Sequence, residues 1–160
     1  MALRESTPPL QKIVMSDENI LSQRFEIRGG DFSNAGKSST SIKEILQEIG
    51  IDSSIIIRTS IASYEAEMNI VMYAQKGMLT LNVTPEKIHL RLEDDGPGIE
   101  NIELAMKEGF STATEKMREM GFGAGMGLPN IKRNADKFEI FSERGKGTSL
   151  DITIYLNTTE

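Results

Sequence analysis

The chain has 160 residues, enough for one domain with a buried core, and its 24 acidic residues outnumber its 18 basic ones to give a net charge of −6. This acidity argues against general binding to nucleic acid or to an anionic membrane. Because the chain has no cysteine and one histidine, a disulfide scaffold and a cysteine nucleophile are excluded, and a protein-built zinc site is disfavoured.

The first 19 residues are polar and include a Pro-Pro pair, so we predict a flexible N-terminal lead-in over 1–19, followed by a single domain over 20–158. The start of the chain lacks the apolar segment of a signal peptide. No apolar stretch approaches the roughly 20 residues that a membrane span needs. We therefore expect a cytoplasmic protein that binds neither membrane nor nucleic acid.

The first predicted elements are an edge strand and a helix. Polarity alternates over 24–28, as in a short half-exposed strand. The helix that follows is expected to be capped by Ser33 or Asn34 and stopped by Gly50. Its apolar face is formed by Ile42, Ile45, Leu46 and Ile49.

A longer helix is predicted from residue 53 to about 75, closed by a Lys-Gly pair. Alternating apolar residues then predict a hairpin with strands over 79–83 and 88–92. A short helix is expected over 101–107.

The last predicted elements are a helix over 130–137 and a second hairpin, which begins at residue 138 and turns at 144–147. Strands that neighbour strands, with helices grouped between them, predict an α/β (α+β) two-layer sandwich. We expect its sheet to be mixed and mostly antiparallel, with the helices on one face.

The stretch GGDFSNAGKSST, residues 29–40, ends in Gly-Lys-Ser like a P-loop. The P-loop pattern requires a glycine five residues before Gly36, where this chain has Asp31. An acidic side chain there would also repel phosphate. We therefore predict an ordinary helix start, with Lys37, Ser38 and Ser39 on its solvated side.

A second glycine-rich run, MGFGAGMGL, stands directly before the helix predicted at 130–137. Its four alternating glycines are Gly121, Gly123, Gly125 and Gly127. Alternating glycines let the backbone approach a ligand closely, and a helix N-terminus adds the positive potential that binds phosphate. The alternative is a flexible loop without a ligand.

Glu65 and Asn69 lie four residues apart on the predicted long helix, so they share one face. The apolar residues of that face are Ile61, Ala62, Met68 and Met72. In such surroundings a glutamate can act as a general base, and an asparagine oxygen can bind Mg²⁺. The alternative is a solvated helix edge.

Two predicted turns carry further candidates. Asp94, Gly96 and Gly98 follow a strand, where a carboxylate can accept the amino group of adenine and glycines can admit the base. Gly147 and Thr148 open the last strand, where a hydroxyl can reach a phosphate or a bound water. Each motif also fits an ordinary tight turn.

In this order and spacing, the motifs resemble the N, G1, G2 and G3 boxes of the Bergerat-fold (GHKL) ATPases, over residues 55–150. That superfamily groups gyrase B, the MutL repair proteins, heat-shock chaperone ATPases and sensor histidine kinases. The runs NIVMYAQKG, EDDGPGI and GMGLPNIKR resemble the bacterial anti-sigma-factor serine/threonine kinases, most closely their stressosome switch-kinase branch. The segment 113–120 is longer than that branch leads us to expect.

The resemblance implies a Bergerat, or histidine-kinase-like, ATPase fold that uses ATP and Mg²⁺. By position, Glu65 would be the catalytic base that deprotonates the attacking hydroxyl or water. Asn69 would ligate Mg²⁺, and Asp94 would bind the N6 amine of adenine.

The resemblance also implies that Gly96 and Gly98 shape the base pocket and that Thr148 supports the adenine side. The four glycines of MGFGAGMGL would wrap the phosphates. An ATP lid is implied over about 100–125, hinged at 110–112.

The function implied is that of an ATP-dependent serine/threonine kinase that regulates a sigma-factor or stress pathway by phosphorylating a STAS-domain anti-sigma antagonist. A sigma factor, a PP2C-type phosphatase or a second copy of the chain are further candidate partners. The alternative is a nucleotide-gated anti-sigma or sequestering module with little or no kinase activity. A histidine-kinase fragment is disfavoured, because the single histidine, His89, is expected to face solvent on a strand.

Overall fold

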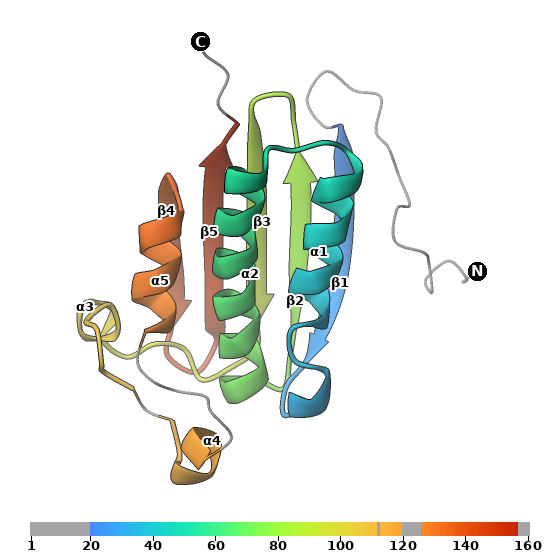
Figure 1. Cartoon of the computed structure of the whole chain (residues 1–160). Helices are drawn as coiled ribbons and strands as arrows, with labels where there is room; N and C mark the ends of the chain where they lie inside the picture. The colour runs from blue at the N-terminus through green and yellow to red at the C-terminus, as the bar shows by residue number, and fades with distance from the viewer. Residues whose placement is uncertain (1–19, 112, 120–125, 157–160) are drawn as a thin grey trace.

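The computed structural model describes residues 20–111, 113–119 and 126–156 (Figure 1). The lead-in predicted over 1–19 lies outside these residues. In chain order the elements are β1 Leu21–Arg28, the 3-10 turn η2 Phe32–Asn34, α1 Lys37–Glu48, α2 Ser53–Tyr73, β2 Lys76–Val83, β3 Lys87–Asp94, α3 Ile102–Ala105, α4 Glu115–Glu119, α5 Gly127–Asn134, β4 Lys137–Glu143 and β5 Gly147–Tyr155.

The five strands form one sheet in the order β1-β2-β3-β5-β4. Helices α1, α2 and α5 cover one face of this sheet, with α2 packed between the other two (Figure 1). The predicted two-layer sandwich is therefore confirmed, and β1 lies at an edge as expected. Every strand pair is antiparallel, so the described sheet is not mixed.

The core lies between the sheet and the three helices. Both strands of the first predicted hairpin point their apolar residues into it, and these side chains are at most 2% exposed: Leu79, Leu81, Val83, Ile88, Leu90 and Leu92. Small residues of α2, such as Ala62 and Ala66, are fully buried against them and let the helix lie close to the sheet. The alternation of apolar residues in the sequence therefore predicted correctly that the two strands pair as a hairpin and which of their side chains face the core.

The opposite face of the sheet carries mostly polar residues, with Phe141 and Tyr155 exposed on it. His89 lies there, but it does not stand free in solvent as predicted. Its Nε2 is 2.9 Å from Oδ1 of Asp151 on β5, and its side chain is only partly exposed. The prediction that His89 faces solvent failed because Asp151 lies beside it on the neighbouring strand, a pairing that the sequence pattern does not reveal.

The start of α1 differs from the prediction. Ser33 and Asn34 do not cap the helix, because their side chains bond instead to the carboxylate of Asp31 within the preceding turn. The N-cap is Gly36, with a left-handed φ of 95° and no side-chain cap. At the other end Gly50 stops the helix as predicted, whereas Ile49 lies past the last turn and is 40% exposed.

The prediction that Ser38 and Ser39 face solvent is also wrong, since both are buried. They lie against Glu67 of α2, whose carboxylate accepts hydrogen bonds from the backbone N–H groups of Gly36, Ser38 and Ser39 at 3.0, 3.3 and 3.0 Å. Lys37 alone is exposed, as predicted. The helix start that resembled a P-loop thus binds an anionic group of the chain itself.

The helix predicted over 130–137 is α5, which begins and ends three residues earlier. Pro129 lies in its first turn, where a backbone N–H has no acceptor within the helix, so the absence of that N–H in proline costs no hydrogen bond. Within the described residues, no helix is both long enough and apolar enough to span a membrane.

Candidate functional site

A cavity of about 780 Å³ opens between the second half of α2 and the end of the sheet where β3 finishes and β5 begins. The first turn of α5 and the segment around α3 form its other walls. A volume of this size suits a small-molecule ligand. The predicted site residues that line it are Glu65, Asn69, Asp94, Gly98, Gly127 and Thr148.

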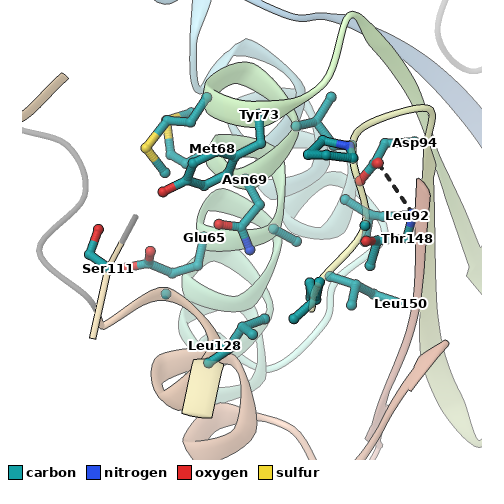
Figure 2. A pocket seen from close by; sticks show the side chains of 18 of the residues that line it. Glu65, Met68, Asn69, Tyr73, Leu92, Asp94, Ser111, Leu128, Thr148 and Leu150 are labelled. Atoms are coloured by element: carbon teal, nitrogen blue, oxygen red, sulfur yellow. Dashed lines mark hydrogen bonds between the residues drawn. The ribbon is translucent and has the colours of Figure 1, made fainter. Parts of the chain in front are cut away.

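Polar groups stand at two ends of the cavity. Figure 2 shows Glu65 at one end, Asp94 with Thr148 at the other end, and Asn69 between them. The intervening wall is apolar, with Leu92, Leu150 and Tyr73 among its residues. The cavity can therefore take an elongated ligand with one polar group at each end and a flat apolar part between them.

Glu65 and Asn69 lie one turn apart on α2 and both point into the cavity (Figure 2). A Cβ atom added to Gly127 would lie 3.6 Å from both Glu65 Oε1 and Asn69 Oδ1, so the start of α5 faces the same two oxygens. Within the described residues the amide of Asn69 has no hydrogen-bond partner. Its oxygen is therefore available to a ligand.

Asn130 of α5 is a site residue that the sequence did not reveal. Its Nδ2 donates to Oε2 of Glu65 at 3.0 Å, and its Oδ1 accepts from Nη1 of Arg133 at 2.9 Å. The signal that could have found it is its spacing from Gly127, which is three residues and thus one helical turn. Placing the helix start at residue 130 concealed that spacing.

Asp94 is the last residue of β3 and pairs with Thr148 in the sheet register. Its Oδ1 accepts hydrogen bonds from the backbone N–H of Gly96 at 2.8 Å and of Thr148 at 3.3 Å. Partial burial raises the pKa of this carboxyl above its ordinary value. The second oxygen, Oδ2, has no partner among the described residues and remains free to accept a proton donor from a ligand.

The neighbouring Asp95 bonds to the backbone of another segment and does not line the cavity. Its Oδ1 accepts the backbone N–H groups of Gln75 and Lys76, both at 3.0 Å, and these bonds lower its pKa. It thus ties the loop after β3 to the junction of α2 and β2. This restraint holds Asp94 at the cavity.

Ser142 of β4 is a second residue that sequence reasoning missed. Its Oγ accepts the backbone N–H of Ile99 at 2.7 Å and lies 2.9 Å from Oγ1 of Thr148. The two hydroxyls meet because Ser142 and Thr148 are cross-strand partners. Without the register of β4 and β5, no feature of the sequence joins them.

Three predicted glycines let backbone segments pack closely around Asp94. Gly98 has φ 83°, and a Cβ there would lie 2.5 Å from the carbonyl oxygen of Glu143. Gly147 has φ 110°, and its Cβ would lie 2.0 Å from the carbonyl oxygen of Asp94. Gly96 is buried beside Asp94 Oδ1. Gly98 and Gly147 therefore require glycine for steric reasons, as the alternative of a tight turn also predicted, whereas a Cβ at Gly96 would lie 3.1 Å from its nearest atoms.

Several predictions fall outside the described residues. Gly121, Gly123 and Gly125 lie there, as does Thr112 of the implied lid hinge. The other hinge residues, Phe110 and Ser111, line the cavity. The described part of the implied lid contains the short helices α3 and α4.

The donor set fits Mg²⁺ held jointly by protein and phosphate. Within the described residues, no group of three or more His, Cys, Asp or Glu side chains could hold a metal alone. The free oxygen of Asn69 is of the kind that Mg²⁺ accepts alongside phosphate oxygens. The N-terminus of α5, at Gly127, adds a positive potential on the same side of the cavity.

Comparison with known proteins agrees with this geometry. A family model described as histidine kinase-, DNA gyrase B- and HSP90-like ATPase matches residues 57–160. The serine/threonine-protein kinase RsbT of Bacillus subtilis (strain 168) is 31% identical over 118 residues, which cover 71% of this chain and 83% of that protein. An anti-sigma F factor of Caldanaerobacter subterraneus subsp. tengcongensis is 33% identical over 105 residues, covering 62% of this chain and 68% of its own.

Among solved structures, a chain of the SiaB–SiaC complex of Pseudomonas aeruginosa superposes with a TM-score of 0.57 at 13% identity. The match covers 86% of this chain and 90% of that one. This likeness concerns the fold.

Proposed function

Because the chain belongs to the histidine kinase-, DNA gyrase B- and HSP90-like ATPase family, we propose that it is an ATP-dependent protein serine/threonine kinase. Its proposed substrate is a STAS-type anti-sigma antagonist, through which it regulates a sigma-factor or stress pathway. The observation that carries the proposal is the carboxylate of Glu65, which projects into the cavity one helical turn from the amide of Asn69, a group that no other described residue engages in a hydrogen bond. Nucleotide binding alone does not require a base at that point.

The adenine end is proposed at Asp94. Its free Oδ2 would accept the N6 amine, while Gly98 and the apolar wall would cover the ring. Ser142 supports this assignment, because its bond to the hydroxyl of Thr148 would fix that group at the same end.

The phosphate end is proposed at the start of α5. Backbone N–H groups would reach the phosphates from four glycines, namely Gly121, Gly123, Gly125 and Gly127. Asn69 would hold Mg²⁺, which neutralises the charge that develops on the phosphate oxygens. Lid closure over about 100–125 would exclude water from the transfer.

Glu65 is proposed to remove the proton from the attacking hydroxyl. The serine or threonine oxygen of the partner forms the new bond to the γ-phosphorus, the bond to the β-phosphate oxygen breaks, and ADP leaves. The proton passes to Glu65, whose Oε1 has no partner among the described residues. General base catalysis of this kind contributes about 10²–10⁴-fold.

The test mixes the purified chain, Mg-ATP and STAS-domain proteins encoded near it, and detects phosphorylated partner by mass spectrometry. Wild type is compared with Glu65→Gln and with Glu44→Gln, which removes an exposed carboxylate of α1. We expect Glu65→Gln to bind ATP with an unchanged Kd while transfer falls by about 10²–10⁴-fold. Transfer that survives intact in Glu65→Gln would contradict the assigned base.

A second function is supported by the anti-sigma F factors among the relatives. The chain would then hold a sigma factor, a PP2C-type phosphatase or its activator according to the bound nucleotide, with little transfer. The same experiment separates the two, because this alternative predicts ATP-dependent capture of a partner without its phosphorylation. A chain that binds no adenine nucleotide would contradict both.

A further inference from the structure

We propose that Asn130 is a positioning residue that orients the carboxylate of Glu65, and that Arg133 and Glu108 in turn fix the amide of Asn130. The inference rests on the proposed function, since it takes Glu65 to be the base of a phosphoryl transfer. Asn130 touches neither proposed substrate. It acts through Glu65.

The direction of the Asn130 amide is settled by its two partners. Arg133 can only donate hydrogen bonds, so the group that faces its Nη1 at 2.9 Å must be the amide oxygen. The NH₂ group consequently faces Glu65, where Nδ2 lies 3.0 Å from Oε2. A flipped amide would lose both bonds.

The bond to Asn130 decides which oxygen of Glu65 is presented. The terminal torsion of a glutamate is soft, so an unrestrained carboxylate samples a broad range of orientations. Here Oε2 is held by Asn130, and Oε1 is the oxygen that lies near Gly127, at the start of α5. The arrangement keeps Oε1 on the side of the proposed phosphates, where the hydroxyl proton must be taken.

Arg133 also contacts the segment that follows α3. Its Nη2 forms an ion pair with Glu108, within the proposed lid. Both side chains are more than half exposed, so this pair contributes little to stability. Its role is to direct the guanidinium toward Asn130, and the orientation of Glu65 is therefore linked to the lid segment through two side chains.

The test measures kcat and KM for ATP in transfer to the partner. Asn130→Ala is expected to lower kcat by about 10–100-fold, because a misplaced catalytic group costs on that order, and to leave KM within about twofold. Asn130→Asp is expected to lower kcat further, since it replaces the donor by a second carboxylate. Lys132→Ala is the control, because it removes an exposed side chain from the same helix.

A double mutant separates positioning from structure. If Asn130 acts only through Glu65, then Asn130→Ala should change the residual rate of Glu65→Gln by no more than about twofold. An additive loss in that background, a rise in KM alone, or an unchanged kcat in Asn130→Ala would overturn the proposal.

A second readout does not depend on kinase activity. The side-chain amide resonance of Asn130 in the nucleotide-free protein should shift in Glu65→Gln and in Arg133→Gln, and stay fixed in Glu44→Gln. A protein that phosphorylates no partner but shows these shifts would refute the proposed kinase and support the Asn130–Glu65 contact. A resonance indifferent to Glu65→Gln would refute the positioning role whatever the activity.

Discussion

The backbone N–H of Ser39 donates a hydrogen bond of 3.0 Å to Oε1 of Glu67, a carboxylate that is 2% exposed. Gly36 and Ser38 donate to the other oxygen of the same group. Glu67 thereby satisfies N–H groups that the first turn of a helix leaves without partners. It also balances the positive end of the helix dipole, as a phosphate does at a P-loop.

This contact predicts that Glu67→Gln lowers the free energy of unfolding by about 2 kcal/mol or more. An amide offers one acceptor where the carboxylate offers two, and its NH₂ group would face backbone donors in a buried place. Urea denaturation measures the change. The control is Glu48→Gln, an exposed position near the end of α1, which should change stability by less than about 0.5 kcal/mol. Equal effects of the two substitutions would contradict the anchoring role.

Asp94→Asn is expected to stabilise the fold and weaken nucleotide binding together. The pKa of Asp94 is raised by burial, so the native state holds this proton more tightly than the unfolded chain does. Stability from this group is fully present below its ordinary pKa of 3.8 and is lost as pH rises through the raised value. An asparagine keeps an oxygen for the N–H groups of Gly96 and Thr148 without the charge.

Two measurements check this trade-off. In urea denaturation the advantage of Asp94→Asn over wild type should be largest at pH 7 and shrink as the pH falls toward 3.8. In calorimetry the Kd for ATP should rise about tenfold or more, since an amide NH₂ would face the adenine amine. An unchanged Kd would remove Asp94 from the nucleotide site.

Gly147→Ala is expected to cost about 3 kcal/mol or more of unfolding free energy. It combines a strained φ of 110° with a Cβ only 2.0 Å from the carbonyl oxygen of Asp94. Gly145 is the matched control, because it has φ 81° and nothing within 4 Å of an added Cβ. Gly145→Ala should therefore cost only the backbone strain, about 1 kcal/mol. Similar losses would show that packing against Asp94 contributes nothing.

The sequence predicted the parts of the fold that repeat a local pattern. Alternating polarity over β2 and β3 predicted both the strands and the face that packs on the core, because successive side chains of a strand point to opposite faces of the sheet. Helix starts were less certain. At α1 the cap is a backbone conformation of Gly36, with no side chain for a pattern to reveal.

The site was predicted where its residues lie within one motif. Glu65 and Asn69 share a helix face, and Asp94 ends the strand directly before the loop that holds Gly98, so spacing alone grouped each pair. The contacts of Asn130, Ser142 and Glu67 were missed. Glu67 accepts hydrogen bonds from residues 28 to 31 positions earlier in the chain, and Asn130 bonds to Glu65, which is 65 positions away. Ser142 meets Thr148 only through the register of two strands. Such contacts depend on how the elements pack.

Ser142→Ala tests one of these missed contacts. The substitution deprives the N–H of Ile99 of its acceptor and frees the hydroxyl of Thr148, so unfolding free energy should fall by about 1–2 kcal/mol. The Kd for ATP should rise several-fold, because Thr148 lines the proposed adenine end.

The control is Ser149→Ala, one residue from Thr148 on the same strand. Its Oγ is buried without a partner in the described structure, so its removal should leave both stability and Kd within experimental error or raise stability slightly. If Ser142→Ala behaves like Ser149→Ala, then the hydroxyl pair of Ser142 and Thr148 does not organise the site. If it weakens ATP binding while Ser149→Ala does not, β4 contributes to nucleotide recognition without touching the nucleotide.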